Sequence, residues 1–159
     1  MNLQELIAQT DLDLNEGQVR AFFLGALFAD KPLPFNKAQE ELLSEAPEAK
    51  KALEPHLKTL WDKLNDKDQD QLASLFPDKG SVQEFLTTAL ERLDYFLTGL
   101  SLAGSLADDE QTEVLDELEN VVMDLDEYLS DDKPEVEAGE ELKEQLMGAW
   151  EELVKLKKS

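Results

Sequence analysis

SVQEFLTTALERLDYFLTGLSLAG, residues 81–104, is the stretch that decides the fold of this chain. Its apolar side chains recur at intervals of three and four, which places them on one face of a long helix. They are Leu86, Ala89, Leu90, Leu93, Phe96, Leu97 and Leu100. Ser81, with Glu84 three residues later, has the pattern of a capping box, and Gly104 is a suitable C′ residue. We therefore predict a helix that begins at Ser81 and stops at Gly104.

Gly99 lies within the apolar face of this predicted helix, where glycine costs about 1 kcal/mol relative to alanine. A helix retains such a glycine most readily where another backbone comes close. The segment FFLGALFA, residues 22–29, aligns with FLTGLSLA, residues 96–103, so that Phe, Gly and Ala match. We therefore predict that two central helices cross in the core near Gly25 and Gly99.

The N-terminal half of the chain shows further helical patterns. Asn15 and Gln18 predict a capping box at the start of a helix over residues 16–29, and Asn36 is the expected N-cap of a short helix that ends at Leu43. Pro55 interrupts a leucine-rich helical pattern over residues 53–64, so we expect a kink or a fresh helix start there. Residues 1–12 are expected to form a mobile N-terminal segment.

The C-terminal half has two long helical patterns, residues 106–129 and residues 134–157. In the first, the side chains expected to face inward are Leu115, Leu118, Val122, Leu125 and Leu129. In the second they are Leu142, Leu146, Ala149, Trp150 and Leu153. Taken together, the patterns predict an all-α fold: a multihelical bundle of about seven helices that forms one domain over residues 1–159.

The composition excludes several classes of site. The chain has no cysteine, so a disulfide scaffold, a cysteine zinc site, an iron–sulfur cluster and a thiol nucleophile are ruled out. We expect no signal peptide, because the N-terminus lacks a basic region followed by an apolar one. No apolar run approaches the length of a transmembrane helix. The expected location is the cytoplasm.

Charge is the strongest compositional signal, since the formal net charge is −22. Residues 108–144 contain seventeen acids and two bases, which gives a net charge of −15. This excess disfavours direct binding to nucleic acids and anionic membranes, whose affinity for proteins comes from Lys and Arg. It is compatible with a basic protein partner and with a solvated acidic face. The candidate partner surface comprises Asp108, Asp109, Glu113, Asp116, Glu117, Asp124, Asp126, Asp131 and Asp132.

No catalytic or cofactor motif is present, and we expect no cofactor and no metal site. The single histidine, His56, cannot supply the two Glu-x-x-His pairs of a di-iron bundle, and we expect it to lie at the surface. Asp66-x-Asp68-x-Asp70 has the spacing that begins an EF-hand loop, but glutamine and proline occupy the later glycine and glutamate positions. Phe28, Leu33 and Phe35 are expected to cover the end of the bundle, with an exposed apolar patch as the alternative.

Three segments together resemble the YgfB-like proteins, an uncharacterised bacterial family. They are RAFFLGALFA (residues 20–29), LFPD (75–78) and LERLDYFLTGLSLAG (90–104). Positions matching the family framework are Gly25, Pro77, Asp78, Gly99 and Leu102. The family's Trp-Cys pair is replaced here by Leu93-Asp94, and the C-terminal metal module of the related YecA-type proteins has no counterpart. The resemblance implies an all-α cytoplasmic bundle without established catalytic residues.

These observations lead to one functional hypothesis and three alternatives. The hypothesis is a non-enzymatic interaction or regulatory protein whose acidic C-terminal half engages a basic, nucleic-acid-binding protein. The alternatives are a helical enzyme without a recognisable motif, a weak binder of divalent metal ions, and a homodimer that associates through the helices of Gly25 and Gly99.

Overall fold

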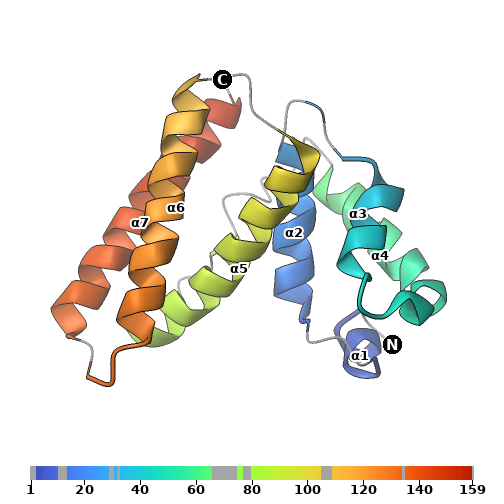
Figure 1. The fold of residues 1–159 in the computed structure, drawn as a ribbon, viewed down its shortest axis with the longest axis horizontal. Coiled ribbons are helices and arrows are strands. Elements are labelled where there is room, and N and C mark those ends of the chain that lie inside the picture. Colours follow the sequence, from blue (N-terminus) through green and yellow to red (C-terminus); the bar gives the residue numbers. More distant parts are fainter. Residues whose placement is uncertain are drawn as a thin grey trace. The chain divides into compact units, whose positions relative to one another are not determined.

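The computed structural model describes residues 3–10, 14–28, 31, 33–65, 75–76, 80–104, 109–133 and 135–158. Throughout this part of the chain every regular element is a helix, so the predicted all-α class is confirmed (Figure 1). The elements are α1 (Leu3–Ala8), α2 (Glu16–Phe28), α3 (Phe35–Leu42), the short 3₁₀ helix η1 (Pro47–Ala49), α4 (Lys50–Leu64), α5 (Val82–Ala103), α6 (Asp109–Leu129) and α7 (Val136–Lys158). None of these helices combines the length and the hydropathy needed to cross a bilayer.

The helices belong to two compact units. The N-terminal unit comprises Met1–Gln71 and Tyr95–Ser105, and the C-terminal unit comprises Leu72–Asp94 and Leu106–Ser159. Helix α5 is shared, since its first half belongs to the C-terminal unit and its second half to the N-terminal unit.

Helix α2 is the centre of the N-terminal unit. Its residues 21–26 are all buried, because α1, α3, α4 and the second half of α5 pack against it. Phe23 is fully buried and meets Trp61 of α4 edge-on, with 5.1 Å between the ring centroids. Phe28 packs in the same manner on Phe96, at 5.6 Å. Phe28 is therefore buried, as expected for a residue that covers the end of the bundle, and is no part of an exposed patch.

Helices α2 and α5 cross at Gly25 and Gly99, as the sequence predicted. A Cβ atom added to Gly25 would overlap the carbonyl group of Phe96, and one added to Gly99 would overlap the carbonyl group of Phe22. The two backbones therefore touch directly, and each glycine faces the other helix of the same chain. Neither glycine is left to contact a second copy of the chain.

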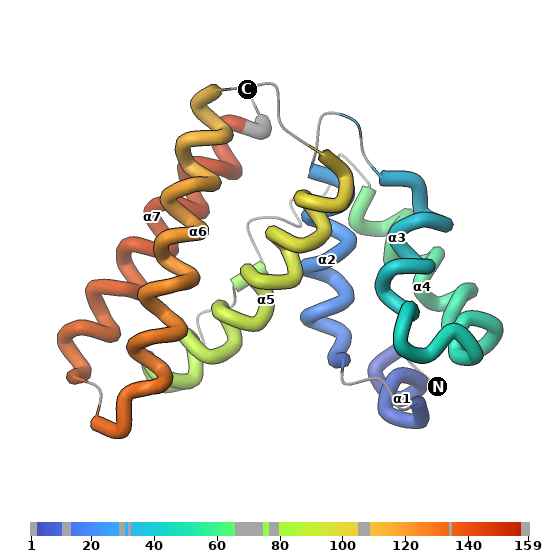
Figure 2. Tube along the Cα trace, viewed as in Figure 1, coloured from blue at the N-terminus to red at the C-terminus, as the bar shows by residue number. Residues whose placement is uncertain are grey.

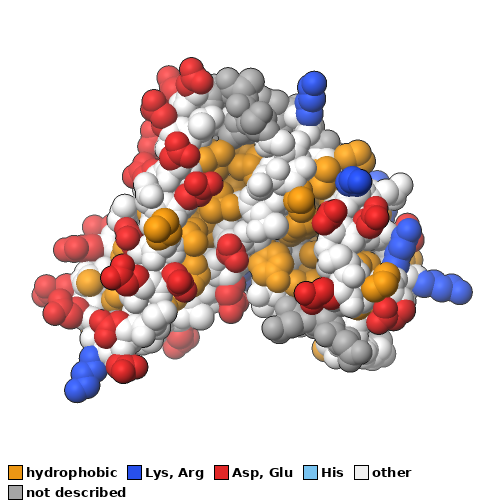
Figure 3. Space-filling model, viewed as in Figure 1, with side chains coloured by type: hydrophobic (Ala, Val, Ile, Leu, Met, Phe, Trp, Pro, Cys, Tyr) orange, Lys and Arg blue, Asp and Glu red, His pale blue; other side chains and the backbone are white. Residues whose placement is uncertain are grey.

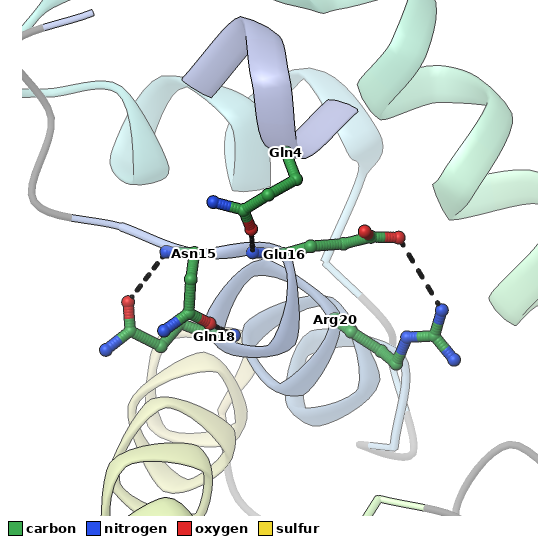
Figure 4. A network of polar contacts seen from close by, with 5 residues as sticks. All are labelled: Gln4, Asn15, Glu16, Gln18 and Arg20. Atoms are coloured by element: carbon green, nitrogen blue, oxygen red, sulfur yellow. Dashed lines mark hydrogen bonds and ion pairs between the residues drawn. The ribbon is translucent and has the colours of Figure 1, made fainter. Parts of the chain in front are cut away.

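The predicted capping box at the start of α2 is present (Figure 4). The backbone N–H of Gln18 donates to Asn15 Oδ1, and the backbone N–H of Asn15 donates to Gln18 Oε1, both at 2.9 Å. Gln4 of α1 accepts a third bond, at 2.7 Å, from the backbone N–H of Glu16. Glu16 also pairs with Arg20 at 3.8 Å. Side chains therefore satisfy three of the amide groups that a helix start leaves without partners.

The predicted ends of α5 are also confirmed. Ser81 Oγ accepts a hydrogen bond from the backbone N–H of Glu84 at 3.2 Å, as in a capping box. Gly104 ends the helix with φ of +114°, a left-handed conformation that favours glycine.

In the C-terminal unit, α6 and α7 pack side by side as a hairpin (Figure 2). Leu118 and Leu125 of α6 are fully buried, as predicted. The buried stripe of α6 is nevertheless rotated from the prediction, because Leu115, Val122 and Leu129 are only half-buried. The buried residues are Gln111, Val114, Leu118, Val121 and Leu125. Valines at 114, 121 and 122 allow either stripe from sequence alone, and packing on α7 selects one of them.

One predicted helix boundary was wrong, and one of the two alternatives predicted for Pro55 is excluded. Helix α3 begins at Phe35 with Pro34 at the N-cap position, so Asn36 lies in the first turn and does not cap. The fixed φ of proline suits a helix start, where no N–H is needed. Helix α4 runs through Pro55 without a fresh start, because η1 and α4 together begin upstream at Pro47.

Gln39 is the most deeply buried polar side chain of α3. It is 1% exposed, and its Oε1 has no hydrogen-bond partner among the described residues. An unsatisfied buried acceptor costs free energy that an apolar side chain of similar shape would not. We therefore expect Gln39→Met to raise the free energy of unfolding by about 1 kcal/mol, as measured by urea denaturation. Gln83→Met, at an exposed position of α5, is the control and should change it little. A less stable Gln39→Met variant would show that Oε1 has a partner that stabilises the fold.

Candidate partner surface

Helix α6 carries the densest negative charge of the described helices. Over Asp109–Leu129 it has nine acidic residues and no Lys or Arg. All nine are exposed: Asp109, Glu110, Glu113, Asp116, Glu117, Glu119, Asp124, Asp126 and Glu127. Acidic side chains gather over α6 and α7 in Figure 3. We call the exposed side of α6, together with Asp131 and Asp132 of the following turn, the acidic face.

The helical period arranges the acidic face around one outward row. Asp109, Asp116 and Met123 are separated by seven residues each, so they follow one another along the helix, opposite the buried stripe. Glu113 and Glu127 flank this row at spacings of four residues. The row is therefore acidic over most of its length and apolar at Met123.

Neighbouring charges of this face repel one another. Asp109 and Glu113 are four residues apart, as are Glu113 and Glu117, and like-charged pairs at this spacing destabilise a helix by about 0.2–0.5 kcal/mol each. None of the nine carboxylates of α6 forms an ion pair with a described residue. Among the described residues, no basic side chain compensates this repulsion.

The C-terminal end of α6 is also charged against its dipole. Acids near a helix N-terminus are stabilising, which suits Asp109 and Glu110. Asp126 and Glu127 lie in the last turn, where the partial charge is negative and basic residues are preferred, yet the last turn has none. The stability of α6 therefore gives no reason for acids at its C-terminal end.

Met123 is an apolar side chain within the acidic face. It is 70% exposed, and the residues three or four positions away are Glu119, Asn120, Asp126 and Glu127. Methionine is flexible and polarizable, so it adapts to different contact surfaces. Val136, at the start of α7, is 68% exposed in the same unit. The acidic face thus offers charge together with a site for apolar contact.

The turn after α6 holds the remaining described acids of the predicted surface. Asp131 accepts a hydrogen bond from the backbone N–H of Lys133 at 3.1 Å, and Asp132 is exposed. Tyr128 donates to the carbonyl of Glu135 at 3.1 Å, which joins the end of α6 to the start of α7. The turn is therefore held by bonds of its own, and its two aspartates face solvent.

The structure brings together eight of the nine acids predicted for the partner surface. Asp109, Glu113, Asp116, Glu117, Asp124 and Asp126 lie on α6, and Asp131 and Asp132 on the adjoining turn. Asp108, the ninth, lies outside the described residues, as do Pro77 and Asp78 of the predicted framework. The prediction omitted Glu110, Glu119, Glu127 and Met123. A helical projection of residues 109–129 would have placed all four outside the apolar stripe.

No catalytic or metal centre emerges from the described side chains. No three His, Asp or Glu residues among them converge closely enough to hold a metal ion. His56 is half-buried on α4, which carries Lys and Leu on either side of it. Asp66, Asp68 and Asp70, which have the spacing that begins a calcium loop, lie outside the described residues.

Comparison with known proteins gives no relative from which a function could be transferred. No family model, no curated protein and no solved structure matches the chain. The resemblance to the YgfB-like proteins therefore stays a prediction.

Proposed function

We propose that this chain is a non-enzymatic interaction or regulatory protein whose acidic face binds a basic protein. The observation that carries the proposal is the composition of α6: nine exposed acids, no basic residue and no ion pair to any described residue. A nucleic-acid-binding protein is the expected kind of partner, since it presents clustered Lys and Arg to a phosphate backbone. The acidic face would compete for those side chains.

The energetics of α6 support this proposal. Repulsion between neighbouring acids and the charges at the C-terminal end weaken the isolated helix. Basic side chains of a partner would relieve both effects. Binding would therefore recover the stability that this repulsion costs α6 in the unbound protein. Solubility alone does not require a helix without basic residues, since a surface of mixed charge is also soluble. Lysines occur on α7 but not on α6.

We further propose that the protein is a cytoplasmic bacterial protein and a diverged member of the YgfB-like family. The crossing of α2 and α5 at Gly25 and Gly99 supports this membership, because both glycines belong to the framework that the sequence shares with the family. The absence of a catalytic motif from the sequence is in keeping with a binding role.

The proposal is tested by removing charge from the acidic face. A four-site variant keeps the side-chain shapes and abolishes four exposed charges. Its substitutions are Asp116→Asn, Glu117→Gln, Asp124→Asn and Asp126→Asn. We expect affinity for a captured basic partner to fall about tenfold, since each exposed ion pair contributes about 0.2–1 kcal/mol. Binding to the purified partner is measured by calorimetry. The variant should fold at least as stably as the original chain, because repulsion is reduced.

The matched control removes the same number of charges from the N-terminal unit. Glu40, Glu41, Glu45 and Glu48 are all exposed, and their replacement by glutamine removes the same amount of negative charge from the chain. If the control weakens binding as much as the α6 variant does, the attraction is a property of the net charge, and the assignment to the acidic face is wrong.

A further inference from the structure

A groove of about 610 Å³ lies on the N-terminal unit between the start of α3 and one side of α4. It is lined by Pro34, Phe35, Asn36, Lys51, Glu54, Pro55 and Lys58. All of these residues belong to one compact unit, and none of them belongs to the acidic face. The groove is largely open to solvent, so it suits an extended chain better than a small ligand, which is usually enclosed over most of its surface.

The groove lies on the one described helix that is net positive. Helix α4 has four lysines and two acids, in a chain whose net charge is −22. Lys and Arg side chains lie among Asp and Glu side chains on the right of Figure 3, over α3 and α4. Lys51 and Lys58 are both exposed and are seven residues apart, which places their backbones about 10.5 Å from each other along the helix axis.

The floor of the groove is aromatic and fixed in place. Phe35 is half-buried, and its ring lies edge-on to Trp61, with centroids 5.7 Å apart, and to Phe23, at 6.2 Å. The ammonium group of Lys58 lies 5.1 Å from the Phe35 centroid. A cation over an aromatic ring is held near an apolar contact surface. The groove therefore combines a positive charge with a rigid apolar floor.

Pro55 leaves one backbone carbonyl of α4 without its usual helical donor. Because proline has no N–H, the carbonyl of Lys51 lacks the amide donor that a helix normally supplies four residues later. Both residues line the groove. A peptide N–H in the groove could donate to this carbonyl.

We propose that this groove binds an acidic segment of a partner protein in the polyproline II conformation, with two carboxylates three residues apart. A polyproline II helix has three residues per turn and a rise of about 3.1 Å, so such carboxylates project from one edge about 9 Å apart. That spacing matches Lys51 and Lys58. A proline between the two acids would pack on Phe35 and Pro55. The conformation has no internal hydrogen bonds, so its N–H groups are free to donate.

Two acids of α4 oppose this ligand. Glu54 is half-buried between the lysines, and Asp62 pairs with Lys58 at 3.2 Å. The ligand's contacts with the two lysines and with Phe35 must outweigh the repulsion from both acids. Replacement of Glu54 by glutamine should therefore tighten binding, which a role of Glu54 in the fold alone would not predict.

The test is an NMR titration of the ¹⁵N-labelled full chain with a blocked peptide, Ser-Glu-Pro-Leu-Glu-Ser. We expect saturable amide shifts confined to residues 33–39 and 50–62. The double variant Lys51→Glu, Lys58→Glu should weaken binding about tenfold, and Glu54→Gln should strengthen it about threefold. The control, Lys63→Glu, reverses an exposed lysine of the same helix outside the groove and should change the affinity less than about twofold.

Several outcomes would overturn the proposal. They are no saturable shift, equal binding of the peptide in which both glutamates are glutamine, and equal weakening by Lys63→Glu. Tighter binding of free glutarate would assign the groove to a small dicarboxylate, and tighter binding of a thymidine hexanucleotide would assign it to nucleic acid. Because the titration of the unmodified chain maps the site by itself, misfolding of the double variant would not remove the test.

Discussion

Replacement of Gly99 by leucine is expected to unfold the N-terminal unit. The Cβ alone would overlap the Phe22 carbonyl and lie 3.0 Å from the backbone nitrogen of Ala26, and neither backbone atom can rotate away as a side chain can. Leucine adds three further carbon atoms at the same place. Overpacking of a core costs about 1–3 kcal/mol where side chains can adjust, so contact with backbone should cost more. The loss approaches the whole stability of a typical domain, about 5–15 kcal/mol.

Gly99→Ala gives the graded form of this experiment, and Gly148→Ala is its control. We expect Gly99→Ala to lower the free energy of unfolding by about 3 kcal/mol or more in urea denaturation, because its Cβ alone meets backbone. Gly148 is an exposed glycine within α7, and a Cβ added there meets nothing within 4 Å. Gly148→Ala should therefore raise stability by up to about 1 kcal/mol, through helix propensity. If Gly99→Ala is also stabilising, the two backbones do not touch at this point.

Phe23→Ala is expected to lower the free energy of unfolding by about 3–5 kcal/mol. Phe23 is fully buried, and its ring packs against Phe22, Phe35 and Trp61. Its removal leaves a cavity among rigid aromatic rings, which cannot collapse around the missing volume. The measurement is urea denaturation followed by circular dichroism.

Phe35→Ala is the comparison for this experiment. Phe35 contacts two rings of the same cluster, those of Phe23 and Trp61, but it is half-buried. Its truncation therefore removes less apolar area from the interior and opens no closed cavity. We expect a loss less than half of that for Phe23→Ala. Equal losses would contradict the central place of Phe23 in the aromatic cluster.

Local signals in the sequence were sufficient for much of the fold. The capping pair of Asn15 and Gln18 predicted the start of α2. A side chain and a backbone amide three residues apart can form a hydrogen bond without any tertiary contact. Gly104 predicted the end of α5 for the same local reason. The crossing at Gly25 and Gly99 was predictable because a glycine on an apolar helix face has few explanations other than close backbone contact.

Features that depend on tertiary packing were not predictable in the same way. The buried stripe of α6 was predicted in the wrong rotation, because Val114 and Val121 compete with Leu115 and Val122 for the interior, and only α7 decides between them. The groove was missed altogether. It requires that residues 34–36 and 51–58, on different helices, come together, and no periodicity in either segment indicates this.

For the candidate partner surface, the sequence predicted the acidic residues but not the apolar residue among them. Its acids were identified because they are clustered in one stretch of the sequence, and an acidic helix exposes them wherever it packs. Met123 was missed because a methionine on a helix is ordinarily assigned to the core. Its exposure follows from the rotation of α6, which turns residue 123 away from α7.

The most direct test of the proposed function is capture of partners from a lysate of the source organism at two salt concentrations, about 50 mM and about 300 mM. Exposed charges attract one another strongly at the first concentration and weakly at the second. We predict that a basic protein is retained at about 50 mM salt and released at about 300 mM, and that its binding depends on Asp116, Glu117, Asp124 and Asp126. Retention of no basic protein at the lower concentration would contradict a binding role for the acidic face.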